Sequence, residues 1–365
     1  MISSGAPESA QIKQPLAVVA HDAGGANVIA ALMTRHRDAF DWLPVAAGPA
    51  VSIFTAAGFE RVTQVPPDDE EELVSVLATA KPKAVLTGTG WQTLLERKAI
   101  HVARKLKTPV ASVLDHWVNY RQRFGFPGDW LQNLPDAVLV GDRYAYAQAC
   151  DDGFPRGRLV PVENPYLAGF LGNALQDPID VRRSTDSLRV LFVAEPLNIQ
   201  FAGETNRVAG VSELTVAEEI AQVLSRLDLS ASLVVRSHPS QPASRYAALL
   251  ESKHPIQIKL HDAVDCPLKD DIAAADVVVG VSSMALLVAA ALGRPVIAYA
   301  PHGLSCDLPH REIKHCASLD ALALLLSQCE QMPSALDLQL YSDPFDRVMT
   351  SLVNATSNDL HFTGS

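Results

Sequence analysis

Two adjacent serines in the second half of the chain, Ser282 and Ser283, are the residues best placed for chemistry. They follow the β-branched run Val277–Val279 and precede the apolar, alanine-rich segment Met284–Leu292, so they should connect a buried strand to a helix. Unpaired backbone N–H groups and the helix dipole attract anions at the start of a helix. The pair therefore predicts a site for a nucleotide phosphate, although serine is also a preferred N-cap and Ser283 could serve only that purpose.

The loop at residues 21–27 (HDAGGAN) follows the apolar segment Leu16–Ala20, which we predict to be a strand. His21 and Asp22 would project from the carboxyl end of that strand, where a general base or a substrate-binding group is commonly placed. The loop lacks the GxGxxG spacing of a dinucleotide site, and a tight turn without a ligand would explain its composition equally well. The loop residues that we expect to approach a substrate closely are Gly24, Gly25 and Asn27.

Residues 114–124 (LDHWVNYRQRF) carry many hydrogen-bonding and aromatic side chains at the end of the apolar segment Val110–Leu114. Asp115 and His116 are further candidates for a general base. The other polar side chains suit a polyhydroxylated or anionic ligand, and an arginine can bind a carboxylate or phosphate through two hydrogen bonds. We favour this interpretation over an amphipathic surface loop with Trp117 and Phe124 packed inward, because the segment would share a sheet edge with residues 21–27. The predicted substrate-binding residues here are Trp117, Tyr120, Arg121 and Arg123.

Two segments of the second half supply further candidates for nucleotide binding. The sequence VVRSHPS at residues 234–240 places Arg236 and His238 after an expected strand, and Pro239 favours an extended conformation at His238. By itself this sequence is more typical of a turn without a ligand, but its place in the same predicted sheet as the serine pair favours a phosphate contact. Glu195 follows another expected strand and could accept hydrogen bonds from a base or ribose, or cap its own loop.

These loops depend on a repeating scaffold of strands and helices. The chain alternates short apolar strands with helical segments, which is typical of βαβ units and a parallel sheet. One series of such units ends near Val162 and a second begins at Leu188, with a polar stretch between them. We therefore predict an α/β fold with two Rossmann-like domains that face each other across a ligand-binding cleft. The predicted parts are an N-terminal acceptor-binding and catalytic domain over residues 1–165, a linker over 166–187, a C-terminal nucleotide-binding domain over 188–340, and a tail helix over 341–365 that could cross back to the first domain.

Composition excludes several classes of protein. The chain has 365 residues, of which 48% are hydrophobic and 19% charged, so it can bury an ample core. A net charge of −11 argues against a nucleic-acid partner. The five cysteines have no CxxC spacing, so we predict neither a disulfide framework nor a metal site. No signal peptide or membrane-spanning run is evident, so we predict a cytoplasmic protein. Such a protein could still contact a membrane surface through a local patch. The sequence leaves the oligomeric state open.

The sequence also resembles a known group of enzymes. An HP dipeptide after a strand, followed by a serine pair that opens an apolar helix, resembles nucleotide-sugar glycosyltransferases of the two-domain GT-B fold. More narrowly, it resembles the CMP-sugar group of bacterial sialyltransferases and Kdo transferases. The resemblance implies that His238, Pro239, Ser282 and Ser283 bind the phosphate and cytidine of CMP. It also implies a catalytic base from the first domain, for which Asp22 is the best positional match and the other candidates are His21, Asp115 and His116.

The functional hypothesis from the sequence is a glycosyltransferase that needs neither a metal nor a cofactor. It would move a sugar of the nonulosonic-acid type from a CMP donor to an acceptor hydroxyl, with a base for the acceptor proton and hydrogen-bond donors for the departing phosphate. One alternative is a UDP-sugar 2-epimerase or nucleotide-sugar hydrolase, because these enzymes also place carboxylates and histidines between two facing Rossmann-like halves. Another alternative is a non-catalytic protein that binds nucleotide sugars.

Overall fold

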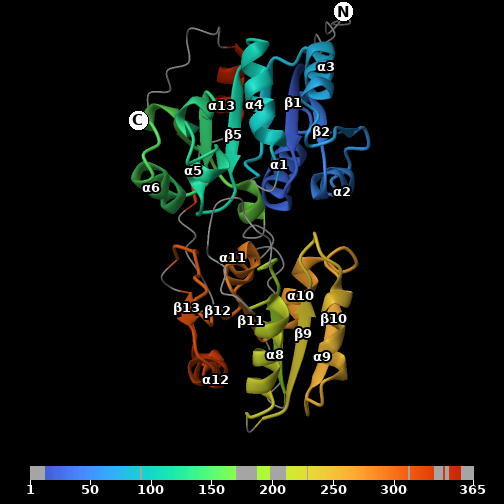
Figure 1. Ribbon diagram of the computed structural model, residues 1–365, viewed down its shortest axis with the longest axis vertical. Helices are drawn as coiled ribbons and strands as arrows, with labels where there is room; N and C mark the ends of the chain where they lie inside the picture. The colour runs from blue at the N-terminus through green and yellow to red at the C-terminus, as the bar shows by residue number, and fades with distance from the viewer. Residues whose placement is uncertain are drawn as a thin grey trace, which may run out of the picture.

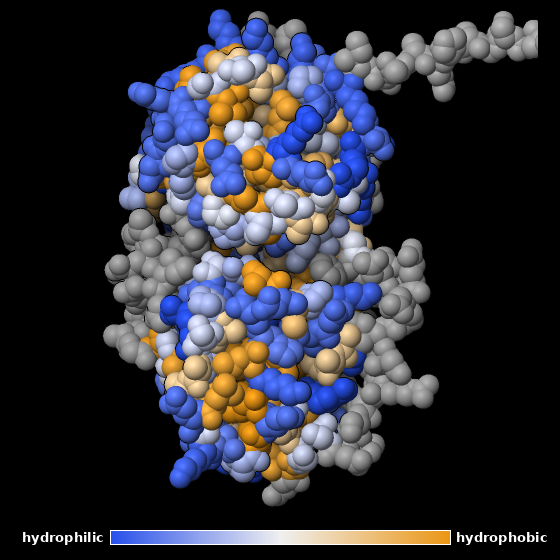
Figure 2. Space-filling view, turned by 90° about the vertical axis from the view of Figure 1, so that its right-hand side faces the viewer, coloured by the Kyte–Doolittle hydropathy of each residue, from blue (hydrophilic) through white to orange (hydrophobic). Residues whose placement is uncertain are grey.

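The computed structural model describes residues 13–90, 93–169, 187–197, 211–227, 229–310, 313–332, 340–341 and 345–354. Two parallel sheets, one from each half of the chain, lie one beyond the other along the longest axis of the molecule (Figure 1). A space-filling view shows the corresponding two lobes with a narrower waist between them (Figure 2). The predicted fold class, an α/β protein with two Rossmann-like domains, is therefore confirmed. Of the predicted linker over 166–187, residues 170–186 lie outside the described residues.

The first sheet has seven strands in the order β3-β2-β1-β4-β5-β6-β7, all parallel. Every residue of β4, β5 and β6 is buried, because helices cover both faces of the sheet. Parallel strands bring their carboxyl ends to one edge, so the loops that follow β1, β4 and β5 meet there. The strands are β1 (Gln14–Ala20), β2 (Phe40–Ala46), β3 (Thr63–Gln64), β4 (Ala84–Thr87), β5 (Val110–Leu114), β6 (Ala137–Val140) and β7 (Leu159–Pro161).

Successive residues of β1 point into two different cores. Leu16 and Val18 belong to one buried cluster, and Ala17 and Val19 belong to the other. This alternation follows from the twofold side-chain period of a strand, and it requires helices on both faces. The helices of this half are α1 (Ala23–Arg35), α2 (Pro49–Ala56), α3 (Glu70–Ala80), α4 (Leu95–Lys105), α5 (Tyr120–Arg123) and α6 (Arg143–Asp151), with 3-10 turns at Trp130–Asn133 and Arg156–Arg158.

The second sheet has six parallel strands in the order β10-β9-β8-β11-β12-β13. Its strands are β8 (Leu188–Val193), β9 (Ala231–Arg236), β10 (Gln257–His261), β11 (Val277–Gly280), β12 (Val296–Tyr299) and β13 (Lys314–Cys316). Its helices are α8 (Glu213–Leu224), α9 (Ala247–Glu251), α10 (Leu268–Ala274), α11 (Met284–Ala291) and α12 (Leu319–Ser327), with 3-10 turns at Ala243–Tyr246 and Cys329–Gln331. Within the described residues, no helix has the length and apolarity needed to cross a membrane.

The last described helix, α13 (Phe345–Asn354), packs on the first sheet although it follows the second sheet in the chain. Its apolar face supplies Phe345, Met349 and Leu352 to the same buried cluster as Leu16 and Val18 of β1. The ring of Phe345 also lies 5.5 Å from the ring of His36, measured between centroids. The core of the first domain therefore includes residues from the end of the chain.

This packing predicts that α13 contributes to the stability of the first domain. Met349 has no exposed surface, so Met349→Ala should lower the free energy of unfolding by about 2–5 kcal/mol through lost burial and a cavity. The matched control is Thr350→Ala on the exposed face of the same helix, which should change stability by less than about 0.5 kcal/mol. Urea unfolding monitored by circular dichroism measures both values. Equal effects of the two substitutions would contradict this packing.

Candidate functional site

The turn between β11 and α11 carries the serine pair at the carboxyl edge of the second sheet. Ser283 is the N-cap of α11, and its side chain accepts a hydrogen bond from the backbone N–H of Ala285 at 3.2 Å. The hydroxyl of Ser282 is buried and accepts from the N–H of Asp307 at 3.0 Å. Both hydroxyls therefore organise the turn itself. A phosphate at this position would be held mainly by backbone N–H groups and the helix dipole.

Glu195, which follows β8, lies directly against this turn. Its Oε1 atom accepts a hydrogen bond from the N–H of Ser282 at 2.5 Å. Desolvation by the surrounding protein raises the pKa of Glu195 to about 7, and the nearby charge of Asp307 acts in the same direction. The charge of this group can therefore change near neutral pH. Its carboxyl accepts the hydrogen bond of a backbone N–H group that an incoming anion would also need.

The carboxyl edge of the first sheet, which faces the second domain, carries a cluster of His21, Asp22 and Glu96. His21 Nδ1 and Asp22 Oδ1 are 2.7 Å apart, and the backbone N–H of His21 donates to Glu96 Oε1 at 2.8 Å. The hydrogen bond to Asp22 is the main reason that the pKa of His21 is raised. Burial, followed by the charge of Asp22, raises the pKa of Glu96 to about 7. Such a cluster can hold and release a proton near neutral pH.

Glu96 was not among the residues predicted from the sequence. It is only 2% exposed, and its Oε2 atom has no hydrogen-bond partner in the part of the chain that the structure describes. The sequence does contain a signal for it, because Glu96 shares one helical stripe with the buried residues Ala99, Ile100 and Ala103. A carboxylate within the apolar stripe of a helix is costly unless it is paired or functional.

Asp115, at the end of β5, is held by Arg123. Its Oδ1 atom lies 2.7 Å from Arg123 Nη1, which also donates to the carbonyl oxygen of Thr89 at 2.9 Å. Arg123 is buried, so its guanidinium fixes the carboxylate of Asp115 and the loop after β4. A Cβ atom on Gly24 would lie 1.9 Å from Asp115 Oδ2, so any side chain there would displace the Asp115 carboxylate. In the same way, a Cβ atom on Gly25 would lie 3.1 Å from the Cα atom of Gly88.

The remaining candidates of residues 114–124 are largely used in packing. Trp117 is buried and donates its indole N–H to both carboxylate oxygens of Asp142, at 3.0 and 3.1 Å. Tyr120 has no exposed surface, and the guanidinium of Arg121 lies over the ring of Phe126. These contacts fit the alternative in which Trp117 and Phe124 pack inward, since both side chains are buried. Asn27, predicted to contact substrate, lies within α1 and is partly buried.

His116 connects the two domains. Its Nε2 atom lies 3.1 Å from the carbonyl oxygen of Ser282 in the serine turn. The neighbouring Trp117 packs edge-on against the ring of His310, which follows β12 in the second domain, at 5.3 Å between centroids. Burial lowers the pKa of His116, and the charge of Arg123 adds to this effect. A neutral His116 at this position is suited to hold the serine turn against the first domain.

His238 follows β9 and faces the first domain. Its Nδ1 atom accepts a hydrogen bond from the backbone N–H of Ser240 at 3.1 Å, which places the hydrogen of the neutral ring on Nε2. Burial lowers the pKa of His238 to about 4, against a smaller opposite effect from the charge of Asp22 across the domain boundary. A neutral imidazole with a free Nε2–H can donate to a phosphate oxygen. Pro239 and Ser240 form the exposed turn behind it.

Arg236 was predicted to bind the nucleotide, but its guanidinium is buried inside the second domain. Nη1 lies 2.5 Å from Asp271 Oδ2 and donates to the carbonyl oxygen of Cys266 at 2.7 Å, while Nη2 donates to the carbonyl oxygen of Ala263. These contacts use the group to fix the loop after β10. The sequence alone could not show whether Arg236 binds a phosphate or fixes a loop. Its hydrogen-bond partners lie some 30 residues further along the chain.

No model of a known protein family matches the sequence, and no curated protein matches it. Several solved structures do share its fold. The UDP-GlcNAc 2-epimerase from Methanocaldococcus jannaschii, in complex with UDP-GlcNAc and UDP, is 13% identical with a TM-score of 0.66, covering 94% of this chain and 100% of that one. The enzyme from Neisseria meningitidis bound to UDP-GlcNAc has the same identity and score, with coverage of 93% and 99%. The S. aureus MnaA–UDP structure is 13% identical with a TM-score of 0.62, covering 93% and 96%.

These similarities correct the functional hypothesis from the sequence. The structure is similar to UDP-GlcNAc 2-epimerases along nearly the whole chain. The hypothesis of a CMP-sugar glycosyltransferase is therefore wrong, and the alternative hypothesis of a UDP-sugar 2-epimerase is favoured. The physical reason is that a histidine after one strand and a capped helix after another are general features of a phosphate-binding Rossmann-like domain. Neither feature specifies the base of the nucleotide or the reaction. At 13% identity the likeness establishes the fold alone.

The tight contact at Gly24 predicts a steric effect on Asp115. Gly24→Ala would force the Asp115 carboxylate away from Arg123, so the free energy of unfolding should fall by about 1–3 kcal/mol. Gly157→Ala is the matched control, because a Cβ atom there would have no neighbour within 4 Å. Chemical denaturation of both variants measures the difference. A Gly24→Ala protein as stable as the control would contradict the contact.

The two carboxyl groups with raised pKa values predict how stability depends on pH. Glu96 and Glu195 have a pKa of about 7 in the folded protein and about 4.5 when unfolded, so the folded state binds more protons between these values. The contribution of these two groups to stability should therefore decline as the pH rises through this window and stay reduced above it, whereas the lowered pKa values of His116 and His238 act in the opposite direction. Glu96→Gln and Glu195→Gln should each flatten the decline, and the double variant most of all. The free energy of unfolding at pH 5 to 8 tests this, with exposed Glu60→Gln as the control; an unchanged decline in the double variant would refute it.

Proposed function

We propose that this protein binds a UDP-activated sugar between its two domains and inverts the configuration at carbon 2 of that sugar. The observation that carries the proposal is that titratable side chains at the edge of the first sheet lie opposite His238 and the serine turn of the second. Asp22 lies close enough to His238 for its charge to act on the ring. The solved structures of the same fold support a nucleotide sugar as ligand, since they contain UDP or UDP-GlcNAc.

The chemistry of inversion at carbon 2 sets the requirements for the site. The C2–H bond must break and re-form on the other face, and this hydrogen is too weakly acidic to be removed alone. If the C1–O bond to UDP breaks as the proton leaves, a C1=C2 double bond takes up the electrons. Return of a proton to the opposite face of C2 and of UDP to C1 completes the reaction. The site therefore needs a base, an acid and a stabilised diphosphate.

The residues of the first domain are suited to the proton transfers. Asp115, ion-paired with Arg123 at 2.7 Å, is our candidate for the base. The His21–Asp22 pair is our candidate for the acid, because the hydrogen bond between them favours the protonated imidazole. Glu96 lies behind this pair, bound to the backbone N–H of His21, and can accept or return a proton as the charge of the pair changes.

The residues of the second domain are suited to the diphosphate. The Nε2–H group of His238 and the backbone N–H groups that open α11 are donors for its oxygens. Glu195 now occupies the N–H of Ser282, so a bound diphosphate would displace it or favour its protonated form. No metal or cofactor is required by this scheme, because hydrogen-bond donors and a helix N-terminus supply the positive potential.

The test uses purified protein and UDP-N-acetylglucosamine in D₂O. Proton NMR should reveal the C2 epimer and replacement of the C2 hydrogen by deuterium. Asp115→Asn should reduce turnover by about 10²–10⁴-fold while UDP still raises the melting temperature, and His238→Ala should weaken UDP binding. Exposed Asp320→Asn is the control and should keep full activity.

The other outcomes identify the alternatives. Accumulation of UDP and free sugar without an epimer would assign nucleotide-sugar hydrolysis to the same site. Binding of UDP with no turnover of any UDP-sugar would leave a binding protein. A melting temperature that responds to CMP but not to UDP would overturn the proposal altogether.

A further inference from the structure

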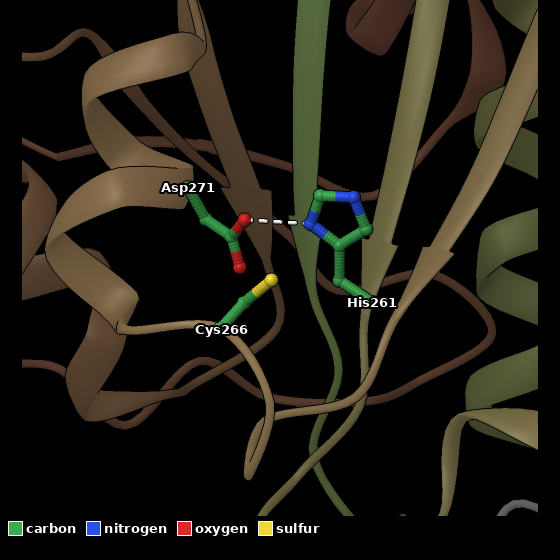
Figure 3. A group of neighbouring side chains, drawn as sticks. All are labelled: His261, Cys266 and Asp271. Carbon is green, nitrogen blue, oxygen red and sulfur yellow. Dashed lines mark hydrogen bonds and ion pairs between the residues drawn. The ribbon is translucent and has the colours of Figure 1, made fainter.

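We propose that His261, Cys266 and Asp271 form a binding site for a zinc-type divalent cation at the edge of the second domain. His261 ends β10, Cys266 lies in the following loop, and Asp271 belongs to α10 (Figure 3). One ligand atom from each residue lies within 4.8 Å of the others. Figure 3 shows the imidazole, thiol and carboxyl pointing toward one another from these three elements. The site is separate from the serine turn and from the His21 cluster, and the inference does not depend on the proposed function.

The geometry needs only small side-chain rotations to enclose a cation. His261 Nδ1 and Asp271 Oδ1 are 2.6 Å apart and are now hydrogen-bonded to each other. Zinc binds nitrogen and oxygen at about 2.0–2.2 Å and thiolate sulfur at about 2.3 Å, which spreads tetrahedral ligands somewhat further apart than this. A cation would take the place of the shared hydrogen between the histidine and the carboxylate, and the thiol would lose its proton on binding.

Arg236 supports the carboxylate from the other side. Its Nη1 atom lies 2.5 Å from Asp271 Oδ2, so Oδ1 is the oxygen that faces His261. Metal-binding carboxylates are commonly oriented by such a second hydrogen bond. The same positive charge opposes a divalent cation, so the affinity should be below that of a four-ligand structural zinc site. Without a cation, these residues form a hydrogen-bonded network of Arg236, Asp271 and His261, which is the alternative that the test must exclude.

The donor set selects the kind of metal. One imidazole, one thiolate and one carboxylate suit zinc and cobalt, whereas magnesium and calcium prefer oxygen ligands alone. Three protein ligands would leave one position for water or another ligand. The three residues are evenly spaced in the sequence, at positions 261, 266 and 271. The first lies on a strand, the second in a loop and the third on a helix. This differs from the paired spacing of common zinc motifs, and the sequence alone predicted no metal for that reason.

The loop of the proposed site is connected to the backbone around His238. The backbone N–H of Ser237 donates to the carbonyl oxygen of His261 at 3.0 Å, and the N–H of Ala263 donates to Ser237 Oγ at 3.2 Å. Ser237 directly precedes His238 in the chain. A cation that fixed the loop after β10 would therefore also restrict the segment that carries His238.

Cobalt is the probe, because a cobalt–thiolate bond gives a charge-transfer absorption band in the near ultraviolet. Titration of the chelator-treated, reduced full-length protein with Co²⁺ should give this band with saturation at one equivalent, and Zn²⁺ should abolish it by competition. Cys266→Ser should remove the band, and Asp271→Asn should weaken Co²⁺ binding at least tenfold. Cys316→Ser, at another partly buried cysteine, is the control and should bind Co²⁺ as the unmodified protein does.

A second measurement guards against variants that fold poorly. Zn²⁺ should raise the melting temperature of the unmodified protein and of Cys316→Ser, but not of Cys266→Ser, whose circular dichroism spectrum should remain native. Retention of the cobalt band in Cys266→Ser would place the metal at another cysteine and overturn the proposal. Absence of the band and of any zinc-dependent shift in the unmodified protein would leave only the hydrogen-bonded network.

Discussion

Both edges of the candidate site depend on one interaction, a carboxyl group that accepts a backbone N–H where a parallel strand ends. Glu96 does this for His21 in the first domain, and Glu195 does it for Ser282 in the second. A carboxyl in protein surroundings is costly when ionised, and one hydrogen bond offsets only part of that cost. The pKa of each group is therefore raised to about 7. The strand ends are thereby held in shape by groups that can change charge near neutral pH.

The arginines illustrate how the fold uses charge internally. Arg123 fixes Asp115 and the loop after β4, and Arg236 fixes the loop after β10. Each side chain forms several directed hydrogen bonds to carbonyl and carboxylate oxygens, which its planar guanidinium is suited to do. Under the proposed function, the donors for a diphosphate within the described residues would be His238 and the start of α11 rather than these arginines. The fold is shared with UDP-GlcNAc 2-epimerases, but its chemistry depends on these particular contacts.

The contact between the domains links the two edges of the site. His116 of the first domain contacts the carbonyl oxygen of Ser282, and Trp117 packs against His310. These contacts adjoin Asp115 on one side and the serine turn on the other. A change in the position of one domain would therefore move Asp115 and its neighbours relative to the serine turn. Helix α13 adds a further connection, since it follows the second sheet in the chain and packs on the first.

The sequence by itself determined the two parallel sheets and the edges at which polar loops gather. Hydrophobic periodicity is local and repeats with each βαβ unit, so most strands could be placed, although the short edge strands β3 and β13 have too few apolar residues to be recognised. Only the tertiary structure decided which polar side chains remain for a ligand. Glu96 lies 75 positions from His21, and Glu195 lies 87 from Ser282, so no local pattern could reveal these pairs. The same holds for Arg236, whose partner Asp271 lies 35 positions further along the chain.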